Sequence, residues 1–138
     1  MYVLDTNVII HRLRKEANVL KNFNDAVISG HNLVIPRAVD YEICRGFGLL
    51  SAPRKEAMYE ELTASDGCCK IVDMEESIWN RSKLIYIELY KKGFTVGEID
   101  IIIAAFCLNH DYTLVTANTK DFENISGLKL VDWTQLSV

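Results

Sequence analysis

Short apolar runs alternate along the chain with longer stretches in which apolar residues recur at helical spacing. This alternation is typical of α/β proteins with a parallel sheet. We predict strands at residues 2–4, 33–35, 70–72, 113–115 and 128–131. We predict helices from about residue 6, at about 17–29, from 36 to near 46 or 48, at 52–63, at 75–91 and from about 96. Pro36 is expected at the first position of its helix, where its missing N–H costs nothing.

The last of these helices is apolar on nearly every side. Thr95 and Glu98 have the spacing of a capping box with Thr95 as the N-cap, and residues 99–108 are apolar except for Asp100. A helix without a polar face is normally buried. Because a buried carboxylate needs a partner, Asp100 is either one half of a buried ion pair with a distant Lys or Arg or a metal ligand.

Three further carboxylates stand at positions that suggest chemistry. Asp5 follows the first strand, at the edge of the sheet where ligands bind in α/β proteins, although it could also simply cap the next helix. Glu42 lies on the helix after the second strand, where a solvated side chain is the alternative. Asp121 follows the fourth strand and could instead complete a helix cap begun by Asn118.

Carboxylates that converge at one edge of a sheet repel one another. At ~4 Å and an effective dielectric constant of about 20, each pair costs about 4 kcal/mol. Hard divalent cations relieve this repulsion, and an all-oxygen ligand set favours Mg²⁺ or Mn²⁺ over zinc. Such ions make a water molecule nucleophilic and hold a phosphate for in-line attack, so the pattern indicates phosphodiester hydrolysis.

Length and composition set the remaining limits. The 138 residues favour a single domain covering 1–138, and 49% apolar with 25% charged residues is ordinary for a globular protein. No apolar run reaches the ~18 residues of a membrane span, and no signal peptide is recognised at the start of the chain. We therefore expect a cytoplasmic protein without a membrane partner.

The cysteines and the net charge add little to the functional picture. Cys44, Cys68, Cys69 and Cys107 form no C-x-x-C pair and no zinc-ligand spacing with the histidines, so we expect reduced thiols, with Cys107 in the core. A net charge of −4 argues mildly against a nucleic-acid partner. Four metal-binding carboxylates would account for that excess.

Taken together, four segments resemble the signature segments of PIN-domain nucleases, and most closely those of the VapC toxins of bacterial and archaeal toxin–antitoxin pairs. They read LDTN at residues 4–7, VDYEICRG at 39–46, DIIIAA at 100–105 and TANTKDF at 116–122. Each segment alone is a weak signal, but the four occur in the family's order and span nearly the whole chain.

The resemblance implies an α/β fold, a PIN-like three-layer sandwich around a parallel sheet of about five strands. It implies an endoribonuclease that needs Mg²⁺ or Mn²⁺. It also implies a homodimer, an RNA substrate and a small cognate antitoxin protein.

The resemblance also assigns roles to residues of the four segments. The implied catalytic and metal-binding residues are Asp5, Glu42, Asp100 and Asp121. Residues that orient ligands or water would be Thr6, Asn7, Thr116 and Asn118. Our own candidates for phosphate contacts are the nearby cations, which could equally form solvated helix faces: Arg12, Arg14, Lys15, Arg37 and Arg45.

Other functions fit the sequence less well. A haloacid-dehalogenase-like phosphatase would need a second Asp at the position of Asn7, and a receiver domain would need an Asp near residue 50. Two alternatives within the PIN fold stay open, a scaffold that only binds partners and a generic nuclease of RNA processing. A pure scaffold gives no reason for crowding like charges.

Overall fold

The computed structural model describes residues 1–135 of the chain. Five parallel strands form one sheet in the order β3-β2-β1-β4-β5. The strands are β1 (Tyr2–Leu4), β2 (Leu33–Pro36), β3 (Cys69–Val72), β4 (Thr113–Val115) and β5 (Lys129–Val131). The predicted α/β fold with a five-stranded parallel sheet is confirmed, and each strand lies within one residue of its predicted bounds.

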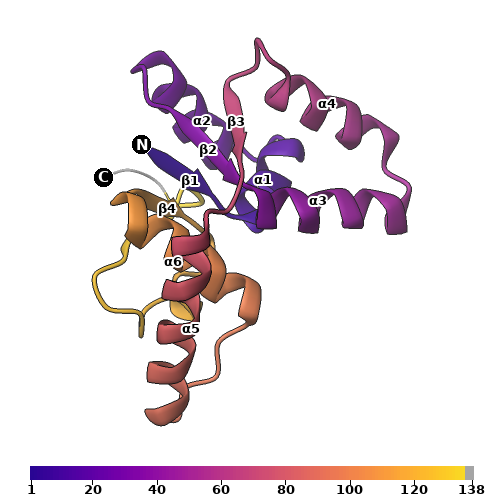
Figure 1. Cartoon of the computed structure of the whole chain (residues 1–138). Helices are drawn as coiled ribbons and strands as arrows, with labels where there is room; N and C mark the ends of the chain where they lie inside the picture. Colours follow the sequence, from indigo (N-terminus) through magenta and orange to yellow (C-terminus); the bar gives the residue numbers. More distant parts are fainter. Residues whose placement is uncertain (136–138) are drawn as a thin grey trace.

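Six α-helices and one 3₁₀ turn connect the strands. They are α1 (Thr6–Leu13), α2 (Ala17–Ile28), α3 (Arg37–Leu50), α4 (Pro53–Thr63), α5 (Glu76–Lys91), α6 (Glu98–His110) and η1 (Thr119–Asp121). Helices α1 to α4 gather in the upper half of Figure 1, and α5 and α6 lie together below them. No helix within residues 1–135 has the length and apolar character needed to cross a bilayer.

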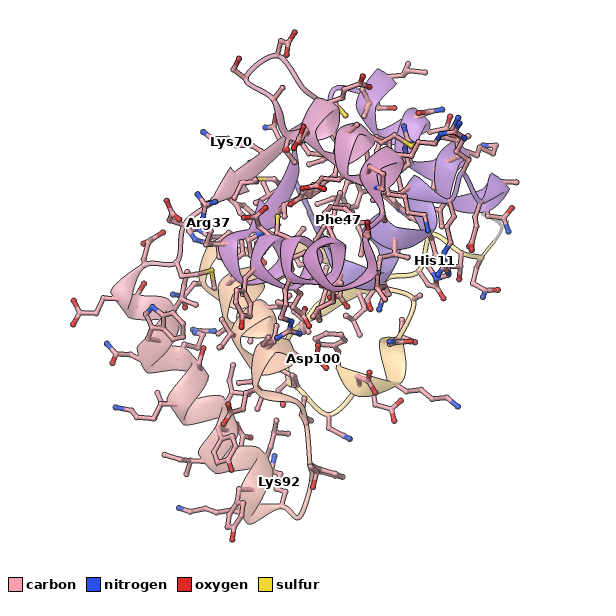
Figure 2. The ribbon with its side chains drawn as sticks, turned by 90° about the vertical axis from the view of Figure 1, so that its right-hand side faces the viewer. His11, Arg37, Phe47, Lys70, Lys92 and Asp100 are labelled. Atoms are coloured by element: carbon pink, nitrogen blue, oxygen red, sulfur yellow. The ribbon has the colours of Figure 1, made fainter. Side chains whose placement is uncertain are left out.

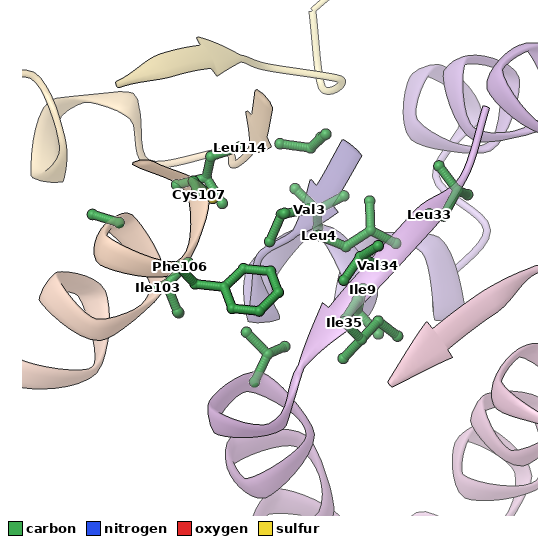
Figure 3. Packing of buried hydrophobic residues seen from close by; sticks show 14 of the residues in the cluster. Val3, Leu4, Ile9, Leu33, Val34, Ile35, Ile103, Phe106, Cys107 and Leu114 are labelled. Atoms are coloured by element: carbon green, nitrogen blue, oxygen red, sulfur yellow. The ribbon is translucent and has the colours of Figure 1, made fainter. Parts of the chain in front are cut away.

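The core lies between the central strands and α6. Figure 3 shows the ring of Phe106 of α6 extending towards β1, where Val3 and Leu4 lie. These three side chains and that of Ile103 are fully or almost fully buried. Cys107 is also fully buried, as predicted. Each fully buried large apolar side chain contributes about 1.5–3 kcal/mol, so this packing holds α6 against β1.

Two predicted helix ends are wrong around α3. Pro36 is the last residue of β2 and the N-cap of α3, because its ψ of 147° is still extended. The helix also continues past Gly46 and Gly48 to Leu50. A glycine inside a helix costs only about 1 kcal/mol. Packing of Phe47 edge-on against Tyr59 of α4, with ring centroids 5.8 Å apart, offsets that cost.

The capping box predicted for α6 is also wrong. The N-cap is Gly97, whose ψ of 143° is extended, and no side chain caps the helix. Thr95 therefore lies in the preceding loop, and Glu98 is the first helical residue. The alternative role of Asp121 as a helix-cap partner is likewise not found, since η1 has no side-chain cap and the Asp121 amide donates to the backbone oxygen of Asn118.

Candidate active site

The candidate site lies at the carboxyl edge of the sheet, the side on which the parallel strands end. The chain adds β2 and β3 on one side of β1 and then crosses over to add β4 and β5 on the other side, so the strand order reverses at β1. Such a switch point opens a crevice at the carboxyl edge. Asp5 and Thr116 directly follow the paired ends Leu4 and Val115 of β1 and β4 and so meet at this crevice.

Asp5 is the most constrained side chain of the site. It is buried, with 4% of its surface exposed, and its Oδ1 accepts a 2.8 Å hydrogen bond from the Thr6 amide. Its Oδ2 accepts bonds from the Thr116 hydroxyl at 2.9 Å and from the Asn7 amide at 3.3 Å. Asp5 therefore caps α1, as the simpler interpretation proposed, and at the same time its second oxygen is held by two polar side chains.

Burial has a larger effect on the pKa of Asp5 than these hydrogen bonds have. Desolvation raises the pKa of this carboxyl above its usual range, the bonds from Thr116 and Thr6 oppose the rise, and the negative charge of Glu42 adds to it. A carboxyl whose charge is disfavoured by burial and by a neighbouring anion is stabilised by any cation that approaches it.

Thr116 and Asn7 form a small network behind Asp5. The Thr116 hydroxyl is fully buried and accepts from the amide of Asn118 at 3.1 Å, and the Asn7 side-chain oxygen accepts from the amide of Ala117 at 3.0 Å. These bonds tie the loop after β4 to the start of α1. Asn118 contributes through its backbone, while its side chain is exposed.

Glu42 is held by Thr6 across 36 positions of sequence. The Thr6 hydroxyl donates to Glu42 Oε1 at 2.7 Å, so this side chain is fixed at the site and is only partly exposed. The alternative of a fully solvated Glu42 is therefore not what the structure shows. Helix α3 brings it there because its buried residues Val39 and Ile43 flank Glu42 on the inner face.

Asp100 lies in the first turn of α6, below α3 in Figure 2. The helix is buried as predicted, but Asp100 itself is only partly buried, because it lies in the first turn, beside the exposed residues Gly97 and Glu98. No Lys, Arg or His forms an ion pair with it within residues 1–135. The ion-pair alternative for Asp100 is therefore not found in this part of the chain.

Four carboxylates share one electrostatic neighbourhood. Desolvation, together with the negative charges of Asp5, Asp121 and Glu42, raises the pKa of Asp100 to about 6. We call Asp5, Glu42, Asp100 and Asp121 the acidic cluster. The structure thus brings together four carboxylates that lie on four separate segments of the chain.

The acidic cluster is a set of neighbours and not a closed cage. Within residues 1–135, no three carboxylate, histidine or cysteine side chains form a ready-made set of metal ligands. The donors are nevertheless all carboxylate oxygens, the type that Mg²⁺ and Mn²⁺ prefer. Their mutual repulsion is what such an ion would relieve, so the residues present fit a divalent metal.

The cations predicted near the site are distributed unevenly. Arg12 stacks over Phe23 of α2 at 4.8 Å. It also lies close enough to Cys69, the first residue of β3, to oppose the rise that burial causes in the pKa of that thiol. Arg12 therefore lies towards the opposite edge of the sheet from Asp5, and Arg14 and Lys15 follow it beyond the end of α1.

The two arginines of α3 differ in their surroundings. Arg37 is bonded to Asp73 at 2.7 Å and to Asp40 at 3.2 Å, so two carboxylates balance its charge. Arg45 is exposed and stacks over the ring of Tyr41 at 5.1 Å. Tyr41 precedes Glu42, and our sequence interpretation did not single it out. The sequence feature that could have identified Tyr41 is an aromatic residue that directly precedes a site carboxylate and lies one helical turn before an arginine.

Comparison with known proteins identifies the class to which this fold and site belong. Residues 2–128 match the family model of the PIN domain, and the chain belongs to that family. The predicted family resemblance is confirmed.

Within the family, several of the similar proteins are VapC ribonucleases. Ribonuclease VapC2 of Rickettsia felis is 26% identical over 96% of this chain and 98% of its own length. The tRNA(fMet)-specific endonuclease VapC of Shigella flexneri is 27% identical over the same shares. The VapBC-1 structure from nontypeable Haemophilus influenzae contains a chain that is 27% identical, with a TM-score of 0.82 over 97% of this chain and 98% of that one. Other chains of this fold come from toxin–antitoxin complexes.

Proposed function

We propose that this chain is a VapC-type ribonuclease toxin that hydrolyses RNA phosphodiester bonds with Mg²⁺ or Mn²⁺ bound at the acidic cluster. The observation that carries the proposal is the gathering of four carboxylates in one place, where burial and three negative neighbours raise the pKa of Asp100 to about 6. Crowded like charges destabilise a fold unless a cation offsets them. The near full-length similarity to VapC ribonucleases supports the same activity.

Asp5, Glu42, Asp100 and Asp121 would hold the metal. When bound, the ion makes a water molecule nucleophilic and stabilises the charge that develops on the scissile phosphate. The remaining contribution of the chain is to keep its oxygen ligands in place before substrate arrives. Thr116 and Asn7 fix Oδ2 of Asp5.

Thr6 gives the acidic cluster its internal order. Its amide donates to Asp5 and its hydroxyl donates to Glu42, so this single residue of the LDTN segment bonds to two carboxylates from two segments of the chain. Fixed donors of this kind orient ligating carboxylates and strengthen metal binding. Asp100 and Asp121 carry no such bonds within residues 1–135 and remain free to adjust.

The substrate and partners follow from the same proposal. Arg45 is the exposed cation nearest to Glu42 in sequence and is the first candidate for a phosphate contact, whereas Arg12, Arg14, Lys15 and Arg37 remain predicted contacts. The chain would act as a single PIN domain in the cytoplasm, as a homodimer, and a small antitoxin protein would inhibit it.

The test of the activity is RNA cleavage by the purified chain in Mn²⁺, in EDTA, and after Mn²⁺ is restored. We expect cleavage only with the metal, and Asp5→Asn should abolish both cleavage and Mn²⁺ binding by calorimetry. Glu60→Gln is the matched control, because Glu60 is an exposed carboxylate on α4 outside the acidic cluster. Undiminished cleavage in excess EDTA would refute the metal-dependent mechanism.

The toxin role has its own test. Expression of the chain should arrest bacterial growth, expression of Asp5→Asn should not, and co-expression of the short reading frame beside the native gene should restore growth. RNA cleavage without growth arrest would exclude the toxin role and favour a generic PIN nuclease. Partner binding without any cleavage would favour the scaffold alternative.

A further inference from the structure

Tyr41 is an aromatic side chain held in solvent directly beside a carboxylate of the acidic cluster. Its exposed fraction is 57%, and the guanidinium carbon of Arg45 lies 5.1 Å from the centre of its ring. Single exposed aromatics are common and need no explanation. Tyr41 differs because a cation–π contact fixes its ring at a defined place next to Glu42.

Helix geometry places both residues on the open side of α3. With 3.6 residues per turn, Arg45 lies about 60° and Tyr41 about 100° around the helix axis from Glu42, in the same direction. The opposite side of α3 carries Asp40, which accepts a 2.7 Å bond from the Tyr59 hydroxyl of α4. Helix α4 therefore covers the flank of α3 that is opposite Glu42. Arg45 and then Tyr41 continue the helix surface from Glu42 into solvent, on the side away from the buried residues of α3.

The charge of Arg45 is available on this flank. Within residues 1–135 it takes part in no ion pair, unlike Arg37, which Asp40 and Asp73 neutralise. A chain with a net charge of −4 that binds RNA beside four carboxylates needs a cation close to the phosphate. Arg45 also occupies one face of the Tyr41 ring, so only the other face can take a further flat group.

We propose that Tyr41 is a base-stacking residue of the nuclease site, and that an unpaired nucleobase next to the scissile phosphate packs on the ring face opposite Arg45. Arg45 thereby both holds the ring and contacts the RNA backbone. A base within a duplex is already stacked and cannot reach the ring, so the site selects unpaired RNA. The proposal rests on the nuclease function and adds the residue that positions the substrate base.

Two substrates and three variants test the proposal. A fluorescein-labelled single-stranded RNA of mixed sequence and the same strand in a duplex are compared for Kd by anisotropy and for KM and kcat in Mn²⁺. We expect Tyr41→Ala to weaken single-strand binding and raise KM by roughly 10- to 100-fold, with kcat changed much less. Tyr41→Phe should retain the wild-type values, because the ring and not the hydroxyl is used.

Tyr90→Ala is the matched control, because Tyr90 is also an exposed tyrosine, at 74%, but lies near the end of α5. A stacking signature completes the design. The emission of 2-aminopurine within the single strand should be quenched on binding to Asp100→Asn and restored when Tyr41→Ala is added to it.

Three outcomes would overturn the proposal: unchanged Kd and KM in Tyr41→Ala, equal cleavage of duplex and single strand by the wild type, or a Tyr41→Ala defect that sedimentation traces to a lost oligomer. The failure of the wild type to cleave any RNA in Mn²⁺ would instead refute the nuclease function itself. Cleavage by the wild type that is indifferent to Tyr41 refutes only the stacking role.

Discussion

The hydroxyl of Thr6 donates a 2.7 Å hydrogen bond to Oε1 of Glu42, and the amide of the same residue bonds to Oδ1 of Asp5. One residue therefore sets the separation of two carboxylates that lie 37 positions apart in the numbering of the chain. Two negative groups would otherwise move apart. The bonds keep them as neighbours at the carboxyl edge, ready to share a cation.

Removal of the Thr6 hydroxyl tests this arrangement. In Thr6→Val the shape is nearly kept and the amide bond to Asp5 remains, but Glu42 loses its donor. We expect Mn²⁺ affinity and RNA cleavage to fall by about 10- to 100-fold, the usual cost of losing a residue that orients a metal ligand. Calorimetric Mn²⁺ binding and cleavage rates measure the effect.

Thr6→Ser is the control, because it restores the donor and should recover most of the activity. The thermal stability of both variants should stay close to that of the wild type, since Thr6 is only partly buried. A Thr6→Val protein with wild-type Mn²⁺ affinity would show that the bond to Glu42 has no role in metal binding.

Thr116 has a different role, because its hydroxyl is fully buried and bridges Asp5 to the amide of Asn118. In Thr116→Val both groups lose a partner inside the protein. An unsatisfied buried polar group costs about 1–3 kcal/mol, so we expect the free energy of unfolding in EDTA to fall by about that amount. Urea denaturation at neutral pH measures the loss.

Thr116→Ser should retain the bridge and lose far less stability. The difference between the two variants isolates the hydroxyl from the methyl group. If Thr116→Val and Thr116→Ser unfold at the same urea concentration, the network behind Asp5 contributes nothing to the fold.

The raised pKa of Asp100 predicts how stability depends on pH. The native carboxyl holds its proton up to about pH 6, whereas the unfolded one loses it near 3.8. Between these values the native state binds more protons than the unfolded state, so stability falls as the pH rises through this window. The shift of Asp5 has the same direction.

Metal-free protein should therefore gain stability from Asp100 as the pH is lowered from 7 towards 5. Thermal melts in EDTA across this range should show the gain in the wild type and a flatter profile in Asp100→Asn. Protons and metal compete for the same oxygens, so Mn²⁺ affinity should weaken below about pH 6. Parallel profiles for the two proteins would contradict this assignment.

The strands could be predicted because each is a short apolar run between polar turns, and such a run is too short to form a buried helix. Asp5 and Asp100 could be singled out because a carboxylate beside or within an apolar run needs an explanation. The helix ends around Pro36, Gly46 and Thr95 could not be predicted, because tertiary packing overrides the local helix propensity of these residues. The hydrogen bond from Thr6 to Glu42 joins segments that are distant in the sequence, so no local sequence pattern predicts it.

The basic residues after Asp5 illustrate the limit most clearly. Arg12 is seven positions from Asp5, which suggested a phosphate contact. Helix α1 rises about 1.5 Å per residue, so it carries Arg12 about 10 Å away, towards Phe23 and the start of β3. Proximity in sequence therefore does not by itself place Arg12 beside Asp5, and its phosphate contact stays a prediction.

Asp100→Asn is the substitution that best separates a catalytic from a structural role. It keeps the shape of the side chain and removes its charge. Because a bound metal supplies several kcal/mol of transition-state stabilisation, weaker metal binding should lower turnover by at least ~100-fold. RNA cleavage in Mn²⁺ and thermal melts with and without the metal are the measurements.

The effect that we expect of Asp100→Asn on stability is opposite in sign to the effect expected if Asp100 formed a buried ion pair. If Asp100 had such a partner, removal of its charge would strand the partner and cost ~3–5 kcal/mol. The structure gives it three carboxylate neighbours instead, so Asp100→Asn removes repulsion and should melt at or above the wild-type temperature in EDTA. With Mn²⁺ the order should reverse, since only the wild type gains fully from binding. A variant that melts much earlier in EDTA yet cleaves normally would refute the catalytic role.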